Sequence, residues 1–252
     1  MDNALLVGLS RQVSLRRELD VIANNIANIN TTGFKGESVK FEQHLDPTAR
    51  HEYFPGNDRR IAFVTDRATL QDFSQGPLQR TDAPLDVAID GPGFFAVQTQ
   101  NGERYTRAGN FHLNPQGQLV TNNGHPVLGQ GGPIVFEPTD TNIAIAADGT
   151  VSATNAAGQV GERGKLRMVT FANPTQLSAQ GDNLWAATNG IVPQTATPAT
   201  RAVQGTLEKS NVSAVKEMNR MLEVTRAYTT ISNMQQRTDE LRRRAIEKLA
   251  EV

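Results

Sequence analysis

Apolar residues follow a helical period near the start of the chain. They recur at steps of four and three, as they do on one face of an α-helix, and they are Leu15, Leu19, Ile22, Ile26 and Ile29. Asp2 or Asn3 can cap the beginning of such a helix. Residues 28–33 consist of Asn, Ile, Thr and Gly and favour a turn at its end. The pattern predicts an N-terminal helix of about 27 residues, roughly 40 Å long.

A second and longer helical pattern occupies the other end of the chain. Residues 213–249 contain no Pro and no Gly. A narrow stripe recurs at steps of three or four along this stretch, and it consists of Tyr228, Ile231, Met234, Thr238, Leu241, Ala245, Leu249 and Val252. Charged residues of both signs occupy the opposite face, as on an exposed helix surface. A narrow stripe with small residues is typical of a seam between closely packed helices.

The middle of the chain changes to short runs with turn signals every eight to twelve residues, which is typical of sheet sandwiches and barrels. The candidate strands are residues 85–89, 94–98, 104–106, 119–121, 143–146, 165–171 and 184–187. The turns between them contain Asp-Gly-Pro-Gly at 90–93, Asn-Gly at 101–102 and 123–124, Gln-Gly at 116–117 and Asp-Gly at 148–149. Residues 46–68 are polar, contain Pro47, Pro55 and Gly56, and fit neither helix nor sheet. We interpret them as part of an extended connector.

Together these patterns predict an α+β protein in which the N- and C-terminal helices pack as a coiled-coil-like unit, with an all-β middle domain and an extended connector. The predicted parts are an N-terminal assembly helix at 1–30, the connector at 31–76, the β-rich middle domain at 77–212 and a C-terminal assembly helix at 213–252. Because both ends are helical and the interior is sheet, we expect the two ends to form one unit.

Composition and charge exclude several classes of function. The 25 Lys and Arg against 26 Asp and Glu give a net charge of -1, so there is no general basic field for nucleic acid or anionic lipid. The chain has no cysteine, which excludes disulfides and thiolate chemistry. No apolar run approaches the length of a membrane span, and the first residues lack the cleavage site of a secretory signal. We expect no direct membrane insertion, and we expect any export to proceed without a cleaved signal peptide.

Candidate catalytic and ligand-binding residues are weak. The four histidines share no metal-ligand spacing. Asp82, Asp86 and Asp90 are spaced four apart, but Pro84, Gly91 and Pro92 place them in turns and strand and not on a helix. The glycines near residue 91 lack the third glycine of a dinucleotide fingerprint, and no nucleophile elbow occurs. We therefore predict no catalytic residue, no cofactor and no metal site, and a protein that is not an enzyme.

Six short segments closely resemble the flagellar rod and hook protein family. The N-terminal signature is LDVIANNIAN at 19–28, followed by NTTGFK at 30–35; the middle segments are TDAPLDVAIDGPGFFAV at 81–97 and YTRAGNF at 105–111; and the C-terminal segments are LEKSNV at 207–212 and EMNRML at 217–222. They occur in the family's order over both ends and much of the middle. Within the family, MDNAL at 1–5 and RRAIEKL at 243–249 are similar to the proximal-rod members.

The resemblance implies a structural subunit of the bacterial flagellar basal-body rod, in its proximal segment, that transmits torque for motility. Its implied partners are copies of itself and other flagellar rod proteins in a hollow helical tube across the periplasm, together with the flagellar type III export apparatus. We expect the assembly interface to include the two helical stripes and three asparagines beside the first stripe, and we expect Ile22 and Leu241 to be buried only between protomers. The predicted residues are Leu15, Leu19, Ile22, Asn24, Asn25, Ile26, Asn28, Ile29, Tyr228, Ile231, Leu241 and Leu249.

Three alternatives stay open at this level. The chain could be a distal-rod member of the same family. A β-rich protein that binds or cuts peptidoglycan is a second possibility, although paired acids of a hydrolase are not visible in the sequence. A nucleic-acid-binding regulator is the third, and the acids interspersed along the basic C-terminal helix argue against it. The asparagines themselves fit either a contact between protomers or a solvated helix end.

Overall fold

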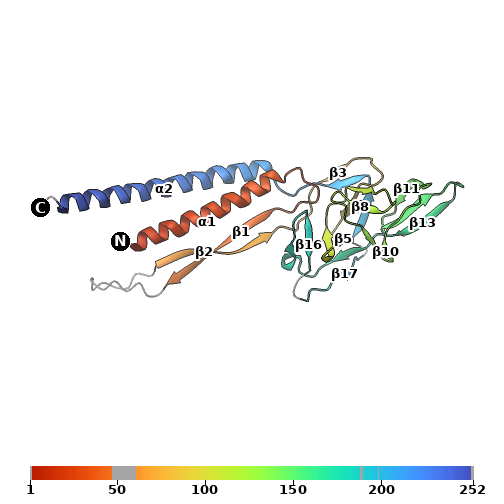
Figure 1. The fold of residues 1–252 in the computed structure, drawn as a ribbon, viewed down its shortest axis with the longest axis horizontal. Coiled ribbons are helices and arrows are strands. Elements are labelled where there is room, and N and C mark those ends of the chain that lie inside the picture. The colour runs from red at the N-terminus through yellow and green to blue at the C-terminus, as the bar shows by residue number, and fades with distance from the viewer. Residues whose placement is uncertain (1, 47–60, 188–189, 198, 251–252) are drawn as a thin grey trace. The chain divides into compact units, whose positions relative to one another are not determined.

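A computed structural model describes residues 2–46, 61–187, 190–197 and 199–250, with the side chains of 2–6, 41–46, 61–68, 249 and 250 left undescribed (Figure 1). The chain forms two compact units. The helical unit consists of residues 1–27, 37–71 and 213–252, and the β unit consists of residues 28–36 and 72–212. The predicted α+β class, with helical ends and a β-rich middle, is confirmed.

The helical unit contains both long helices. Helix α1 (Asp2–Ala27) has 26 residues and α2 (Ala214–Ala250) has 37, close to the two predicted lengths. Within the unit the two helices run alongside each other (Figure 1). The turn predicted after the first helix is present, because the amide of Thr31 donates to the Asn28 carbonyl oxygen at 3.1 Å. Among the described residues, neither helix is at once long and apolar enough to cross a membrane.

The segment expected to be an extended connector contains a pair of long strands. Strands β1 (Glu37–Asp46) and β2 (Ile61–Gln71) form a two-stranded antiparallel sheet, with a register shift between Lys40 and Phe41. The pair belongs to the helical unit and lies against α1. The sequence pattern did not predict this pair because Pro47, Pro55 and Gly56 interrupt the segment, although Val39, Phe41 and Leu45 alternate with polar residues as strand residues do. Residues 47–60 lie outside the described residues.

The β unit is built around one six-stranded antiparallel sheet with several smaller ones. The large sheet has the order β15 (Ser178–Ala179), β16 (Leu184–Ala186), β6 (Gly102–Thr106), β5 (Phe94–Thr99), β14 (Met168–Thr170) and β17 (Gln194–Thr195). A three-stranded sheet contains β11 (Thr141–Ile145), β12 (Thr150–Thr154) and β13 (Val160–Lys165). The paired strands are β4 (Val87–Asp90) with β18 (Arg201–Gln204), β3 (Leu78–Arg80) with β19 (Thr206–Glu208), β7 (Phe111–Leu113) with β8 (Leu119–Thr121), and β9 (Leu128–Gly129) with β10 (Gly132–Pro133). A short 3-10 helix, η1 (Pro174–Gln176), completes the unit.

Two hydrophobic clusters form the core of the β unit. The larger one includes Val87, Phe95, Leu119 and Val151, and the smaller one surrounds Phe94 and Trp185. The predicted glycine turns hold these strands in place. Gly91, for example, has φ +98°, and a Cβ there would lie 2.3 Å from the Ala199 carbonyl oxygen, so no other residue fits without a shift of the backbone.

Candidate assembly surfaces and a buried ion cluster

The first predicted stripe is buried inside the chain's own helical unit. Leu15 and Ile22 are 5% and 2% exposed, and they pack with Val224 of α2. The partly buried residues around this seam are Leu19, Ile26, Met221, Ala227, Tyr228 and Ile231. Six of the predicted residues therefore meet in one cluster. An ion pair from Arg220 of α2 to Glu18 of α1, at 2.9 Å, also joins the two helices.

The expectation that Ile22 is buried only between protomers is wrong. Ile22 is covered within one chain because α2 packs on the same face of α1, and the β1–β2 pair lies against α1 as well. Sequence periodicity identifies an apolar face but does not say which segment covers it. Whether the partly buried members of the seam also contact a neighbouring subunit stays a prediction.

The three predicted asparagines lie in different surroundings. Asn25 is 2% exposed, and its carboxamide pairs with the main chain of Glu37 through Nδ2 to the carbonyl oxygen at 2.8 Å and through Oδ1 from the amide at 2.9 Å. Asn24 is exposed on α1, and Asn28 follows the end of α1 and is half-buried. The structure thus gives Asn25 a role within the chain, namely fixing the start of β1 against α1.

A second set of apolar residues is exposed on α2. It comprises Val215, Met218, Leu222, Met234, Leu241 and Ile246, which are between 56% and 70% exposed. We name it the exposed α2 surface. Leu241 is the predicted interface residue within it, at 65% exposed. Successive residues of a helix are about 100° apart, so these six lie on several sides of α2 and form no single patch. Exposed apolar residues are ordinary one by one, and the part that they take in assembly stays a prediction. Ile29 is half-buried, and the Leu249 side chain lies outside the described residues.

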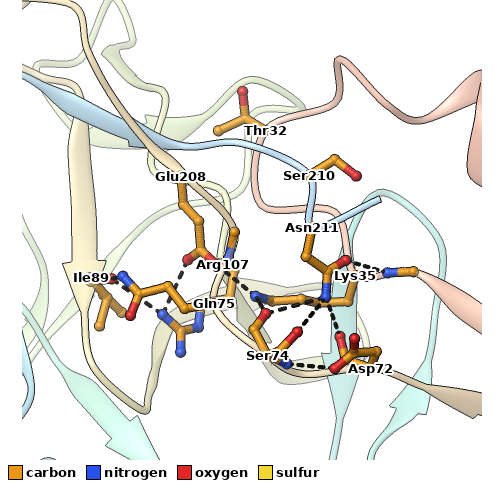
Figure 2. Close-up of polar contacts among 12 residues, drawn as sticks. Thr32, Lys35, Asp72, Ser74, Gln75, Ile89, Arg107, Glu208, Ser210 and Asn211 are labelled. Atoms are coloured by element: carbon orange, nitrogen blue, oxygen red, sulfur yellow. Dashed lines mark hydrogen bonds and ion pairs between the residues drawn. The ribbon is translucent and has the colours of Figure 1, made fainter. Parts of the chain in front are cut away.

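The β unit contains a buried ion cluster that the sequence did not predict. Figure 2 shows the carboxylate of Glu208 between the side chains of Lys35 and Arg107. Lys35 Nζ lies 2.6 Å from Glu208 Oε1, and Arg107 Nη1 lies 3.1 Å from Oε2. All three residues are at most 4% exposed.

Main-chain groups supply further hydrogen bonds to the ion cluster, although Arg107 Nε is buried without a hydrogen-bond partner among the described residues. The Gly76 amide donates to Glu208 Oε1 at 2.9 Å, and Lys35 Nζ donates to the Ser74 carbonyl oxygen at 2.6 Å. Arg107 donates to the carbonyl oxygens of Ile89 and Gly91. Two cations share one carboxylate here, so carbonyl dipoles must compensate the remaining positive charge.

Burial lowers the pKa of Lys35, and the adjacent Glu208 carboxylate opposes this effect. Burial likewise lowers the pKa of Arg107, again opposed by Glu208. The charged side chains of the cluster contact one another and main-chain atoms, as in a structural tie. Beside it, Gly36 and Asp72 are also held, through Asn211, to the segment that follows Glu208 (Figure 2). The described residues contain no group of three or more His, Cys, Asp and Glu that could hold a metal ion.

The cluster joins three segments that the sequence presented separately. Lys35 ends the N-terminal signature, Arg107 lies in the middle segment 105–111, and Glu208 lies in the C-terminal segment 207–212. The one sign of the ion cluster in the sequence is that each of these segments contains a charged residue. Nothing in one sequence indicates which charges are buried, because partners separated by 173 and 101 positions have no common period.

Three family models of flagellar rod and hook proteins match the chain, and their ranges include the three segments that the ion cluster joins. The model described as "Flagella basal body rod protein" matches residues 5–35, "Flagellar hook protein FlgE/F/G D1 domain" matches 88–153, and "Flagellar basal body rod FlgEFG protein C-terminal" matches 203–248. Each of these matches contains one member of the ion cluster.

Similar proteins match the chain over nearly its whole length. The flagellar basal-body rod protein FlgF of Caulobacter vibrioides is 45% identical over 258 residues, which cover 100% of both chains. FlgG of Bacillus subtilis is 35% identical over 96% of this chain and 97% of its own, and FlgF of Mesorhizobium japonicum is 34% identical over 94% of each. The chain therefore belongs to the flagellar basal-body rod protein family, and it is a structural subunit of the rod in the flagellar basal body.

Proposed function

We propose that the chain is a subunit of the proximal rod, which assembles with copies of itself and with other rod proteins into a hollow helical shaft that transmits torque. The observation that carries this proposal is the 45% identity to a FlgF protein over the full length of both chains. The identity to a FlgG protein of Bacillus subtilis is 35%, and it supports the second candidate, a distal-rod position.

The chemistry of the two units supports a role without catalysis. The exposed α2 surface offers apolar contacts for neighbouring subunits. The charged groups of the buried ion cluster bind one another and main-chain atoms, so they hold the β unit together and are not presented to a substrate. We further propose that the subunit reaches the rod through the flagellar type III export apparatus.

An epitope tag at the turn between β12 and β13 tests the position in the rod. Ala156 and Ala157 are exposed at this turn, where an insertion disturbs little packing. The tagged gene replaces the native copy, and cryo-electron tomography of immunogold-labelled basal bodies locates the tag. We expect label at the membrane-proximal end of the rod. Label confined to the hook end would support the distal position, and basal bodies without label in motile cells would contradict both.

A further inference from the structure

Two adjoining hollows on the β unit are lined by an unusual number of carboxamide side chains. The first, of about 510 Å³, includes six asparagines. The second, of about 700 Å³, adds Gln98, Gln100, Asn101 and Gln180. Both include Asn123 and Asp182, so the two hollows adjoin, and we name the pair the carboxamide trough.

The lining of the trough selects a neutral polar ligand. Its charged residues are Asp182 and Arg104, and the Arg104 guanidinium already donates to the Glu103 carbonyl oxygen at 2.8 Å. None of the lining residues has an aromatic side chain of the Phe, Tyr or Trp type, which would supply a flat apolar face for a ligand ring. Carboxamides provide coplanar donors and acceptors without charge.

Most of these carboxamides are bonded to no other described protein group. Within the described part of the chain, six of them make no side-chain hydrogen bond, and these are Asn30, Gln100, Asn101, Asn110, Asn122 and Asn123. Asn183 binds main chain within the protein itself, since its Nδ2 donates to the carbonyl oxygen of Thr32 at 3.1 Å. Asp182 and Asn183 both have backbone angles in the left-handed region, with φ +52° and +56°. The backbone therefore fixes where these two residues lie in the lining of the trough.

Elsewhere in the chain, carboxamides repeatedly bind extended main chain through an N–H and a C=O at once. Asn25 does so with Glu37. Gln75 accepts from the Gly91 amide and donates to the Ile89 carbonyl oxygen, both at 3.1 Å. Gln204 accepts from the Ile145 amide at 3.1 Å and donates to the Ile143 carbonyl oxygen at 2.8 Å. A carboxamide has the same donor and acceptor as a peptide group, so an extended backbone is the ligand that matches these side chains.

We propose that the carboxamide trough binds an extended segment of a neighbouring rod subunit through hydrogen bonds to its main chain. The proposal rests on the proposed function, since a subunit packed in a helical tube has neighbours on several sides. The partner's main chain would satisfy the unused carboxamides, and its side chains would contribute little, so the trough would accept a segment by its extended conformation more than by its sequence.

Single cysteines test the trough, because the chain has none of its own. Asn122→Cys and Gln100→Cys place a thiol at exposed trough positions, and Gln159→Cys places one at the exposed turn between β12 and β13 as a control. Maleimide labelling is measured on the purified full chain and on isolated basal bodies. We expect trough cysteines to label at least tenfold more slowly in basal bodies, with less than a twofold change for Gln159→Cys. Equal rates in both states, or equal protection of all three positions, would overturn the proposal.

A cross-linker on the Asn122→Cys thiol then identifies what covers the trough. Mass spectrometry should find peptides of a rod subunit attached there, and attachment to non-protein material only would overturn the proposal. Retention of the purified chain on peptidoglycan sacculi, reduced at least tenfold by Asn122→Asp with Gln100→Glu, would likewise identify a glycan ligand and overturn it.

The same double variant separates this inference from the proposed function. Asn122→Asp with Gln100→Glu removes donors and adds two negative charges, and Gln116→Glu with Gln159→Glu adds the same charge at exposed positions outside the trough. We expect the trough variant to melt like the native chain but to enter basal bodies at least tenfold less, while the control enters normally. Normal incorporation of the trough variant would overturn the trough alone. Absence of the native chain from basal bodies would overturn the proposed function.

Discussion

Glu208 divides its two carboxylate oxygens between two buried cations, and this arrangement sets the energetic cost of losing it. Glu208→Gln keeps the side-chain size and removes the charge, which leaves Lys35 and Arg107 buried without a counter-ion. Breaking a buried pair in this way costs about 3 to 5 kcal/mol. We expect that loss in the free energy of unfolding of the β unit, measured by urea titration with Trp185 fluorescence. Trp185 is the single tryptophan and is 5% exposed in the β unit, so it reports on this unit.

An exposed ion pair of the same unit provides the control. Asp82 contacts Arg80 at 2.5 Å, and both side chains are more than 70% exposed. Asp82 also has φ +58°, a conformation that Asn tolerates. Asp82→Asn should therefore cost less than about 1 kcal/mol. If Glu208→Gln lowers the urea midpoint no more than Asp82→Asn does, the buried ion cluster is not the tie that we describe.

Tyr105 offers a pH-dependent readout of the core. Burial raises the pKa of its phenol to about 12, and the neighbouring Glu103 contributes to the rise. The unfolded phenol ionises near its ordinary value of 10, so the folded state binds more protons between these two values. The contribution of Tyr105 to stability is thus complete below pH 10 and is lost as the pH rises from 10 toward 12. In a Tyr53→Phe, Tyr228→Phe background, absorbance at 295 nm should show one transition near 12, and a midpoint near 10 would contradict the buried phenol.

At the scale of elements, we expect substitutions at buried and at exposed residues of the helical unit to separate folding from assembly. Ile22 is 2% exposed and packs within the chain, whereas Leu241 is 65% exposed. Ile22→Asp places an unpaired charge in the α1–α2 seam and should lower the helical signal of the monomer in circular dichroism, with a loss of about 3 kcal/mol or more in stability. Leu241→Asp should leave that signal unchanged and reduce incorporation into basal bodies.

The matched control for Leu241→Asp is Glu240→Asp, which keeps the charge at the neighbouring exposed position. Normal incorporation of the Leu241→Asp chain would remove Leu241 from the assembly interface. A folded, helical Ile22→Asp monomer would instead contradict the burial of Ile22 within the chain.

Amide hydrogen exchange on the free chain should divide α2 into two parts. The stretch from Met221 to Ile231 packs against α1 and should be protected, together with α1 from Leu15 to Ile26. The stretch from Leu241 to Lys248 has mostly exposed side chains and should exchange faster. Uniform protection along α2 at low protein concentration would mean that its last turns are stable without a partner.

Local sequence patterns predicted the helices and turns of this fold better than they predicted which segments pack against each other. The helices and the glycine turns follow from residues within a few positions of one another, such as Asn123 and Gly124. The β1–β2 pair was overlooked because a polar, proline-containing stretch separates its strands. The covering of Ile22 and the pairing of Lys35 with Glu208 depend on contacts more than a hundred residues apart, and periodicity carries no information about those. Among the predicted interface residues, the sequence could place only those of the apolar stripes together on a helix face.

At the scale of the whole molecule, each unit is assembled from separate stretches of the chain. The β unit takes residues 28–36 from the N-terminal side and 72–212 from the middle. The Gly33 amide donates to the Glu208 carbonyl oxygen at 2.8 Å, and Lys209 donates from its amide to Pro77 at 2.9 Å. These bonds and the buried ion cluster tie the ends of the unit together, so the β unit retains its own closing contacts when α2 is removed.

Truncation after Val212 tests whether α2 is required for assembly and not for folding of the β unit. The truncated chain keeps every residue of the β unit and loses all of α2, and with it the cover of Leu15 and Ile22 on α1. We expect the purified truncated chain to retain the fluorescence and cooperative urea transition of Trp185. Under the proposed function later subunits stack on a complete rod, so cells that carry only this chain should lack external filaments and should not swim. The full-length gene supplied in the same strain is the control and should restore swimming. Truncated cells that swim with normal filaments would show that α2 and its exposed surface are dispensable for the rod.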